Sequence, residues 1–400
     1  MKIGILTGGG DAPGLNAVIY GALLQAAKTG NQVIGIKKGW EFFAIEKSKI
    51  DQKTIEKYTV PLDVAKLDDL HIQGGTILYS SRTNPFKDVS KAKTPEEKTA
   101  IKKKVADDLT EKMKILGLDA LIAIGGDDTC GVAAAMYEYA KANVVCCPKT
   151  IDNDLNGTNY TFGFYTGAQL ASNMMDNLVT TAKSHQRIFV VEVMGRDAGW
   201  LTLYSGLSTG AAVILLPEKN FSLEKDIIEP IIERAKVGYE YHIIALAEGA
   251  QPTPESLKNE FKTITPEFLA GLKKDSFGNP ILAGVISKVV IDELNKSEKL
   301  KKAITDAGFP VEVRDVVLGH NMRAGTPLVF DRVLGMRYGL KAMKCVEAGD
   351  FGKMMSLQGT EIVTVPVIEG SKKKYINLDS DLMELKDLLC SQKYLAKKKQ

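Results

Sequence analysis

Two aspartates and a lysine lie close together in a polar stretch of the first half of the chain. Residues 148–154 read PKTIDND, so Lys149, Asp152 and Asp154 fall within six positions, directly after the apolar residues 144–147. In such a loop one carboxylate can accept a proton from an attacking hydroxyl while the other binds a metal ion or orients water. A solvated turn would not need this combination after a buried strand, so the functional interpretation is favoured.

A second pair of carboxylates, Asp127 and Asp128, follows two glycines after the apolar residues 120–124. Adjacent carboxylates at the end of a strand suit a hard divalent cation that also carries phosphate oxygens. The alternative is structural, since Asp128 or Thr129 could simply cap the helix that follows. Taken alone, this stretch supports both interpretations equally.

Three successive glycines, residues 8–10, follow the apolar start of the chain. Glycine lets backbone amides approach a phosphate closely, and the helix after the loop offers its N-terminal dipole to an anion. Pro13 stands where a dinucleotide fingerprint has its third glycine, and no Gly-Lys-Ser/Thr closes a Walker loop. A tight structural turn explains this stretch almost as well as a phosphate-binding loop does.

A fourth polar loop, residues 194–199, reads MGRDAG, and Arg196 could bind a phosphate through its planar guanidinium. Other candidate binding residues lie outside these loops: Arg187, Glu248, Arg314, His320 and Arg323. The sequence contains neither a Gly-x-Ser-x-Gly elbow nor a His-Glu-x-x-His motif. Carboxylates, arginines and glycine loops without a covalent nucleophile fit phosphoryl transfer, which depends on positioning and charge stabilisation.

To act together, these loops must lie at the same edge of a sheet. Short apolar runs alternate with amphipathic stretches, which predicts strands over residues 2–6, 32–37, 120–124, 144–146, 188–193, 212–216, 243–247 and 313–318. Parallel strands with helical crossovers bind ligands at their carboxyl ends. We therefore expect an α/β fold with two doubly wound, Rossmann-like lobes, mainly parallel sheets and an active site in the cleft between the lobes.

The length of 400 residues exceeds what one hydrophobic core usually supports. We expect an N-terminal lobe over residues 1–150, a C-terminal lobe over 151–390 with exchange of segments between the lobes, and a polar tail over 391–400. The stretch 251–280, rich in Pro, Lys and Glu, is interpreted as a surface insertion with short helices.

The composition excludes several classes of partner. There are 52 Lys and Arg and 49 Asp and Glu, a net charge of +3, so no nucleic-acid partner is expected. The lysine cluster at residues 372–374 is interpreted as a solvated surface. No apolar run approaches the ~20 residues that cross a bilayer, so no membrane partner is expected. Five cysteines without a CxxC pair predict reduced thiols and a cytoplasmic location.

Taken together and in this order, the loops resemble the phosphofructokinase family over residues 3–332. The matching stretches are residues 6–16, 74–76, 81–82, 125–129, 148–158, 184–187, 191–199 and 318–320. The resemblance implies phosphorylation of the 1-hydroxyl of fructose 6-phosphate to give fructose 1,6-bisphosphate, with Mg²⁺ as cofactor. It implies that the N-terminal lobe binds the donor and Mg²⁺, that the C-terminal lobe binds the sugar phosphate, and that the protein is a homodimer or homotetramer.

The resemblance also implies a role for each matching residue. Asp152 would be the general base, acting with Lys149, Asp128 and Arg196, and Asp127 would bind Mg²⁺. The phosphoryl donor would contact Gly9, Gly10, Arg82, Asp128 and Lys149. The sugar phosphate would contact Thr150, Asp152, Asp154, Arg187, Met194, Gly195, Arg196, Glu248, Arg314, His320 and Arg323, with Arg187 and Arg314 reaching it from a neighbouring subunit in tetrameric relatives.

The donor depends mostly on position 128, which is usually Gly in ATP-using relatives and Asp in pyrophosphate-using ones. A carboxylate there fills space and repels the α-phosphate of a nucleotide by roughly 3 kcal/mol at ~5 Å and an effective dielectric of 20. Asp128 with Lys149 therefore favours pyrophosphate in a reversible reaction. An ATP-dependent enzyme of the same fold and a non-catalytic subunit that binds sugar phosphate remain as alternatives.

One stretch departs from the family pattern. After His320 the family continues with a hydrophobic residue, Gln, Arg, Gly and Gly, whereas residues 321–325 here read NMRAG. Arg323 is kept, so phosphate binding should persist. The changed neighbours imply a reshaped sugar pocket, with sedoheptulose 7-phosphate as a reasonable second substrate.

Overall fold

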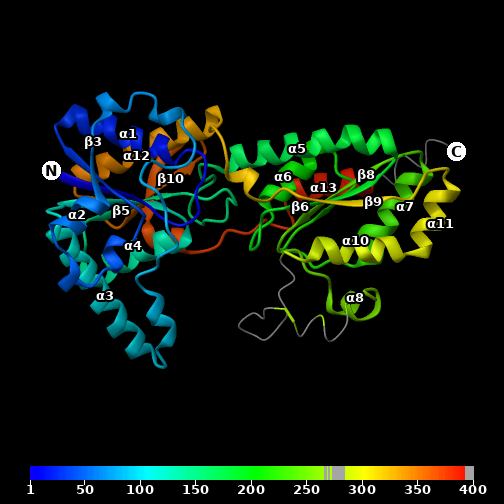
Figure 1. Cartoon of the computed structure of the whole chain (residues 1–400), viewed down its shortest axis with the longest axis horizontal. Coiled ribbons are helices and arrows are strands. Elements are labelled where there is room, and N and C mark those ends of the chain that lie inside the picture. The colour runs from blue at the N-terminus through cyan, green and yellow to red at the C-terminus, as the bar shows by residue number, and fades with distance from the viewer. Residues whose placement is uncertain (265–267, 269–270, 273–283, 392–400) are drawn as a thin grey trace. The chain divides into compact units, whose positions relative to one another are not determined.

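The computed structural model describes residues 1–264, 268, 271–272 and 284–391 (Figure 1). The chain divides into two compact units. Unit 1 comprises residues 1–166 and 323–374, and unit 2 comprises residues 167–322 and 375–400. Within the predicted insertion over 251–280, residues 265–267, 269–270 and 273–280 lie outside the described residues, as do all but the first residue of the predicted tail.

Unit 1 contains a seven-stranded sheet in the order β11-β10-β5-β4-β1-β2-β3. Its strands are β1 (Lys2–Thr7), β2 (Gln32–Ile36), β3 (Thr59–Leu62), β4 (Ala120–Gly125), β5 (Val144–Pro148), β10 (Lys353–Gln358) and β11 (Glu361–Pro366). The five inner strands are parallel, and the edge strands β3 and β11 are antiparallel to their neighbours. Apolar runs without alternation, such as that of β4, are typical of strands buried on both faces.

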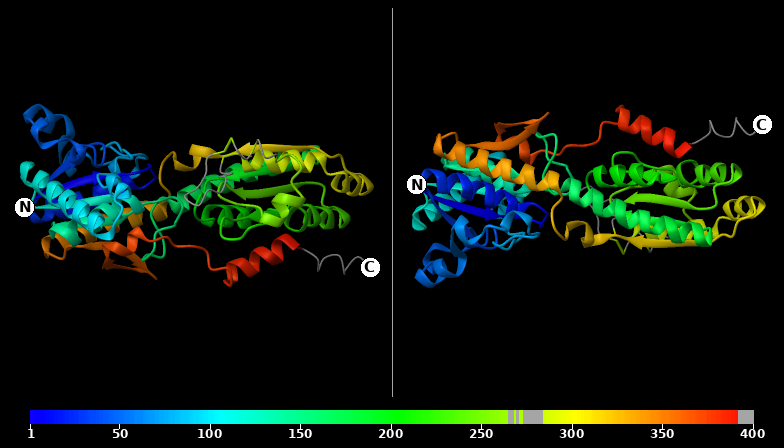
Figure 2. Two further views of the ribbon diagram at one scale, coloured as in Figure 1. Left: turned by 90° about the horizontal axis from the view of Figure 1, so that it is seen from below. Right: turned by 90° about the horizontal axis from the view of Figure 1, so that it is seen from above.

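Helices cover both faces of this sheet. Ile3 and Ile5 of β1 point into a core shared with α1 (Leu15–Thr29) and α12 (Val329–Glu347). Leu6 points into the opposite core, shared with α3 (Pro95–Ile115) and α4 (Asp127–Ala140). Figure 2 shows α12 beside α1, although some 300 residues separate the two helices in the chain.

Unit 2 contains a four-stranded parallel sheet in the order β7-β8-β6-β9. Its strands are β6 (Ile188–Val193), β7 (Val213–Leu215), β8 (His242–Ala247) and β9 (Val313–Val317). Figure 1 shows α5 (Phe164–His185) and α6 (Trp200–Thr209) on one face and α10 (Ile286–Lys296) on the other. The other helices are α7 (Glu229–Lys236), α8 (Pro254–Asn259), α11 (Glu298–Asp306) and α13 (Asp381–Ser391).

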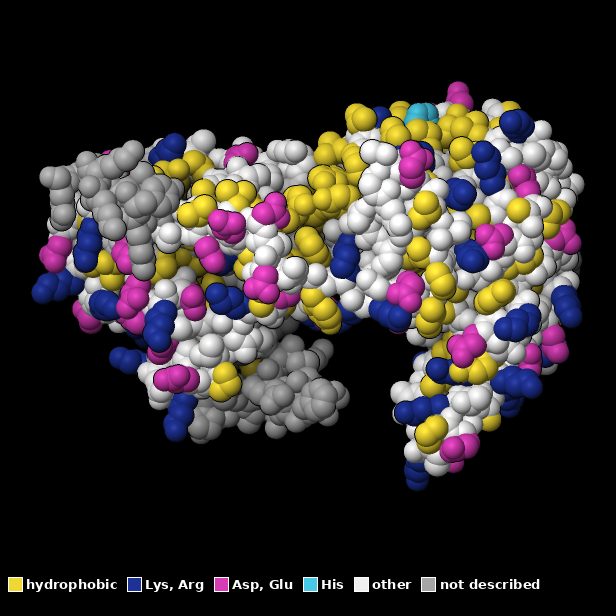
Figure 3. Space-filling view, turned by 180° about the vertical axis from the view of Figure 1, so that it is seen from behind, with side chains coloured by type: hydrophobic (Ala, Val, Ile, Leu, Met, Phe, Trp, Pro, Cys, Tyr) yellow, Lys and Arg dark blue, Asp and Glu magenta, His cyan; other side chains and the backbone are white. Residues whose placement is uncertain are grey.

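Short segments complete the described chain. They are α2 (Gln52–Tyr58), a π-helical segment (Glu224–Ile228) and 3₁₀ segments at Phe42–Ala44, Lys47–Lys49, Val64–Lys66, Leu70–Ile72, Lys87–Lys91, Gly319–Arg323 and Val367–Ser371. No helix in the described ranges is long and apolar enough to cross a membrane. On the face drawn in Figure 3, basic and acidic side chains are interspersed over each unit.

The predicted α/β class and all eight predicted strands are confirmed, with ends that differ by at most two residues. The division of the chain differs from the predicted boundary at residue 150. Residues 323–374 were assigned to the C-terminal lobe, with exchange of segments between the lobes expected. They belong to unit 1, because α12 packs against α1 and β10 pairs with β5. The β10–β11 hairpin and β3 were not predicted.

Candidate active site

The carboxyl ends of β1, β4 and β5 bring three of the predicted loops together in unit 1. These strands are parallel neighbours, so their following loops emerge at the same edge of the sheet. The Gly8 N–H donates to the Ile124 carbonyl at 2.8 Å, and the Lys149 N–H donates to the Gly125 carbonyl at 2.9 Å. The glycine loop, the Asp127 loop and the Lys149 loop are therefore joined by main-chain hydrogen bonds.

The glycine loop has a conformation that side chains would disturb. Gly9 has a φ of 79°, in the left-handed region, and a Cβ added there would lie 3.5 Å from Lys149 Nζ. A Cβ on Gly10 would lie 2.7 Å from Arg323 Nη1, which itself donates to the Asp11 carbonyl at 3.1 Å. The loop is thus lined by two cations, which suits an anionic ligand.

Residues 80–82 lie next to this loop, although they come from a different part of the chain. The Gly9 N–H donates to the Ser81 carbonyl at 2.9 Å, and the Ser80 hydroxyl donates to the Gly9 carbonyl. Arg82, predicted to contact the donor, follows directly and its side chain is exposed. The structure therefore places Arg82 at the same edge of unit 1 as Gly9.

Lys149 and Asp152 are both perturbed by burial. The Lys149 side chain is 3% exposed, and burial together with the nearby Arg323 guanidinium lowers its pKa to about 8. Burial and the neighbouring Asp154 carboxylate raise the pKa of Asp152 to about 6. Asp152 Oδ1 is buried and has no hydrogen-bond partner among the described residues. A half-buried aspartate with one buried, unsatisfied oxygen and a pKa near neutrality suits a general base.

Asp127 and Asp154 converge on a lysine that sequence analysis did not select. Lys373 Nζ lies 2.6 Å from Asp154 Oδ2 and 3.0 Å from Asp127 Oδ2. Burial alone would lower the pKa of Lys373, but the hydrogen bonds and charges of Asp154 and Asp127 outweigh burial and raise it. The interpretation of residues 372–374 as a solvated surface is therefore wrong for Lys373.

Lys374 is also part of this site. Its Nζ donates to Asn153 Oδ1 at 2.9 Å and to the carbonyls of Thr158 and Asn159 at 3.0 and 2.8 Å. Asn153 has a φ of 51°, and its Oδ1 also accepts from the Thr161 N–H at 3.1 Å. Lys374 thus fixes the turn between Asp152 and Asp154, and nothing in a run of three lysines could have indicated this role.

Asp128 lies in the first turn of α4, where its side chain is exposed. The N-cap of α4 is Gly126, so neither Asp128 nor Thr129 caps the helix and the structural alternative for these residues is wrong. Asn84 Nδ2 donates to Asp128 Oδ1 at 3.4 Å. Asp127 and Asp128 border a groove of about 370 Å³ in unit 1, which Phe86 and Lys102 also line.

In unit 2, the loops after β6, β8 and β9 bring together five of the eleven predicted sugar-phosphate residues. The Glu248 N–H donates to the Val193 carbonyl at 2.9 Å, and the Gly249 N–H donates to the Gly195 carbonyl at 3.1 Å. The residues at this edge are Met194, Gly195, Arg196, Glu248 and His320. The Arg196 side chain is 71% exposed and forms an ion pair with Asp197 at 3.1 Å.

Arg187 and Arg314 do not lie with these residues. Arg187 precedes β6 and Arg314 is near the start of β9, so both are at the amino end of the sheet. Each forms an ion pair with Glu312. Thr150, Asp152, Asp154 and Arg323, also predicted to bind the sugar phosphate, belong to unit 1.

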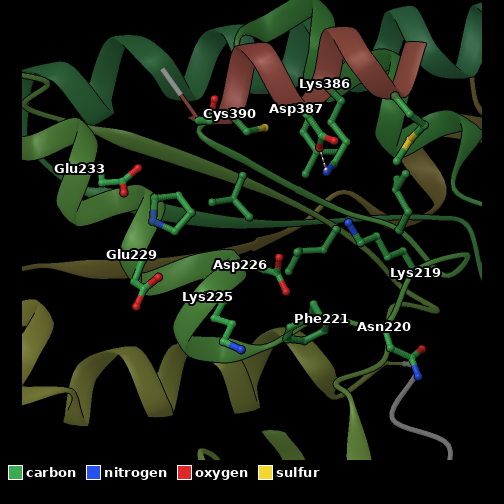
Figure 4. A pocket seen from close by; sticks show the side chains of 17 residues that line it. Lys219, Asn220, Phe221, Lys225, Asp226, Glu229, Glu233, Lys386, Asp387 and Cys390 are labelled. Atoms are coloured by element: carbon green, nitrogen blue, oxygen red, sulfur yellow. Dashed lines mark hydrogen bonds and ion pairs between the residues drawn. The ribbon is translucent and has the colours of Figure 1, made fainter. Parts of the chain in front are cut away.

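A separate cavity in unit 2 contains none of the predicted residues. It has a volume of about 220 Å³ and lies between β7 and α13. Figure 4 shows Lys219, Asp226, Lys386 and Asp387 around it. Charges of both signs line this cavity, so its lining does not favour one class of charged ligand.

Similar proteins identify the family. The phosphofructokinase family profile matches residues 2–346. Two proteins named pyrophosphate–fructose 6-phosphate 1-phosphotransferase are similar to this chain. That of Streptomyces coelicolor is 40% identical over 374 residues, 93% of this chain and 95% of that protein, and that of Amycolatopsis methanolica is 42% identical over 372 residues, 93% and 94%. A protein of Clostridium perfringens named ATP-dependent 6-phosphofructokinase 2 is 39% identical over 363 residues, 90% and 89%.

Solved structures show the same fold. The pyrophosphate-dependent phosphofructokinase of Marinobacter aquaeolei has a TM-score of 0.66 at 19% identity, and the match covers 98% of this chain and 92% of that one. The phosphofructokinase of Saccharomyces cerevisiae has a TM-score of 0.66 at 25% identity. This match covers 92% of our chain but 45% of the yeast chain, so our chain spans less than half its length. From the matching profile and these relatives, the chain belongs to the phosphofructokinase family.

Proposed function

We propose that this protein transfers a phosphoryl group from pyrophosphate to fructose 6-phosphate and forms fructose 1,6-bisphosphate reversibly. The observation that carries the proposal is Asp152, whose carboxyl group has one buried, unsatisfied oxygen. It lies beside the buried Lys149, at the edge where the donor loops meet. Asp128, which lines the neighbouring groove, favours pyrophosphate over a nucleotide, because its charge repels a further phosphate.

In this mechanism, Asp152 takes the proton from the 1-hydroxyl of the sugar as the oxygen attacks the nearer phosphorus of pyrophosphate. The bond from that phosphorus to the bridging oxygen breaks, and inorganic phosphate leaves with its electron pair. Lys149, buried next to Gly9, stabilises the charge that develops on the leaving phosphate. Backbone amides of the glycine loop and Arg82 hold the donor, and Arg196, Glu248 and His320 bind the sugar phosphate.

The residues present fit Mg²⁺. Asp127 and Asp154 each direct one oxygen to a single point, which Lys373 Nζ occupies at 3.0 and 2.6 Å. No group of three or more His, Cys, Asp or Glu able to hold a metal is found in the part of the chain that the structure describes. One or two carboxylates completed by substrate phosphates are what Mg²⁺ usually takes. When bound, Mg²⁺ neutralises negative charge on the phosphate oxygens.

A coupled assay of fructose 1,6-bisphosphate formation tests the proposal. It uses Mg²⁺ and fructose 6-phosphate, with pyrophosphate and ATP supplied separately. Turnover with pyrophosphate and little with ATP is expected. Turnover with ATP alone would contradict the choice of donor, and the similarity to a protein named as ATP-dependent makes this comparison necessary. Binding of fructose 6-phosphate without turnover from either donor would instead indicate a regulatory subunit.

The activity should depend on pH as a bell-shaped curve. Asp152 must be deprotonated to act as a base, so kcat/KM should rise with pH through about 6. Lys149 must be protonated to stabilise the leaving phosphate, so kcat/KM should fall above about 8. Because kcat/KM reports the free enzyme, its two limbs can be compared with these pKa values directly. A Lys149→Arg variant should move the alkaline limb to higher pH, and an unchanged alkaline limb would exclude Lys149 as its cause.

The cellular location and the oligomeric state are also part of the proposal. We expect the protein to act in the cytoplasm, where sugar phosphates are metabolised, and to form a homodimer or homotetramer. Arg187 and Arg314 lie at the amino end of the unit 2 sheet, away from Met194 and Arg196. We therefore expect them to contact the sugar phosphate that is bound in a neighbouring subunit. Sedimentation of the purified protein would give the oligomeric state.

A further inference from the structure

We propose that the Lys373 ammonium group occupies the metal position between Asp127 and Asp154 when no donor is bound, and that metal binding at this position therefore depends on an anionic donor. This inference rests on the proposed function, since it concerns the same carboxylates. With the donor absent, the ammonium group takes the place that a metal ion would occupy. The donor then supplies the negative charge that allows the metal ion and the lysine to be held together.

The interactions of Lys373 support this role. Its Nζ is within 3.0 Å of one oxygen of each carboxylate, and its side chain is 26% exposed. The Asp154 side chain is only 9% exposed, and a buried carboxylate is strongly destabilising without a cationic partner. The Asp127 side chain is 42% exposed, so this carboxylate is the one open to a metal ion from solvent. Lys373 is therefore held mainly by Asp154 and shares Asp127.

The backbone on both sides of Lys373 is fixed to the loop that carries Asp154. Leu155 and Lys373 form an antiparallel bridge, and the Lys374 N–H donates to the Asp154 carbonyl at 2.8 Å. The Asn156 N–H donates to the Lys372 carbonyl at 3.0 Å. Because its backbone is held on both sides, the ammonium group of Lys373 stays within reach of the two carboxylates when a metal ion approaches.

The charges at this edge explain the dependence on the donor. Two carboxylates facing one ammonium group leave a net charge of about −1, and the Lys149 and Arg323 cations lie beside the glycine loop. A divalent cation arriving alone must compete with Lys373 for Asp127 and is repelled by it. Pyrophosphate carries several negative charges and brings its own oxygen ligands, so the metal ion and Lys373 can then be bound together.

Binding of Mn²⁺, used as a substitute for Mg²⁺, tests the proposal without any turnover. Equilibrium dialysis of the full chain at a fixed free Mn²⁺ concentration, with no sugar and no donor, should show weak retention by the wild-type protein. Lys373→Gln should bind Mn²⁺ about tenfold more tightly, the size expected for one charge-assisted hydrogen bond. Lys373→Arg keeps the charge and should behave as the wild type does. Lys372→Gln is the matched control, since Lys372 pairs with Glu369 instead.

Addition of pyrophosphate at the same free Mn²⁺ concentration gives the second readout. Retention by the wild-type protein should rise at least tenfold, and the rise should be smaller for Lys373→Gln. Unchanged or weaker Mn²⁺ binding by a folded Lys373→Gln variant would overturn the proposal, because Lys373 would then only hold the carboxylates in place. If that variant does not fold, tight Mn²⁺ binding by the wild-type protein in the absence of a donor would also overturn the proposal. If the protein shows no turnover with pyrophosphate, the proposed function fails. The Mn²⁺ binding measured without donor would still test the role of Lys373.

Discussion

Replacing Asp152 by asparagine is expected to lower turnover by roughly 10²–10⁴-fold, the usual contribution of a general base. Asparagine keeps the shape of the side chain but cannot accept the proton of the sugar hydroxyl. The buried Oδ1 of Asp152 has no hydrogen-bond partner in the described chain, so the substitution breaks no hydrogen bond at this oxygen. The main-chain N–H of residue 152 should still donate to Thr150 Oγ1, as it does at 3.0 Å in the native protein.

The measurement is kcat with pyrophosphate and fructose 6-phosphate at saturating Mg²⁺, together with the affinity for fructose 6-phosphate. Affinity should change much less than kcat if Asp152 acts in the chemical step. Asp107→Asn is the matched control, because Asp107 is an exposed carboxylate on α3 and should leave turnover unchanged. A loss of less than tenfold for Asp152→Asn would mean that another group takes the proton.

The parts of the site that sequence analysis could predict are those that follow buried parallel strands. The apolar runs before Gly8, Gly125 and Lys149 predicted three strands, and the structure shows that these strands are neighbours. A buried parallel strand has a continuously apolar sequence, and ligands bind at the carboxyl ends of such strands. The site residues in these three loops could therefore be predicted from the local sequence pattern.

Pairings between distant segments were not accessible in this way. Lys373 pairs with Asp154 across 219 positions, and a run of lysines predicts only a solvated surface. The same applies to β10, whose pairing with β5 brings the segment that contains Lys373 back into unit 1. Arg187 and Arg314 are a different case. Arg187 precedes a predicted strand and Arg314 is the second residue of another, which already places both away from the carboxyl ends.

Replacing Asp128 by glycine is expected to let the protein use ATP, with a gain of about 10²-fold in kcat/KM for ATP. The expected gain follows from removing a repulsion of roughly 3 kcal/mol between a carboxylate and a phosphate at ~5 Å. Asp128 is exposed and lines the unit 1 groove, so the change opens space there without disturbing the core. Glycine in the first turn of α4 should cost at most about 1 kcal/mol of stability.

The variant Asp128→Asn separates the two causes of donor choice. Asparagine fills the same space without the charge, so it should gain ATP use if repulsion dominates and should not if the side chain mainly blocks the nucleotide. Activity with pyrophosphate should fall in both variants, since Asp128 is proposed to act at the donor site. The measurement is kcat/KM for each donor at fixed fructose 6-phosphate. If neither variant uses ATP, the carboxylate at position 128 does not determine the donor, and the groove beside Asn84 and Phe86 must exclude the nucleotide by its shape.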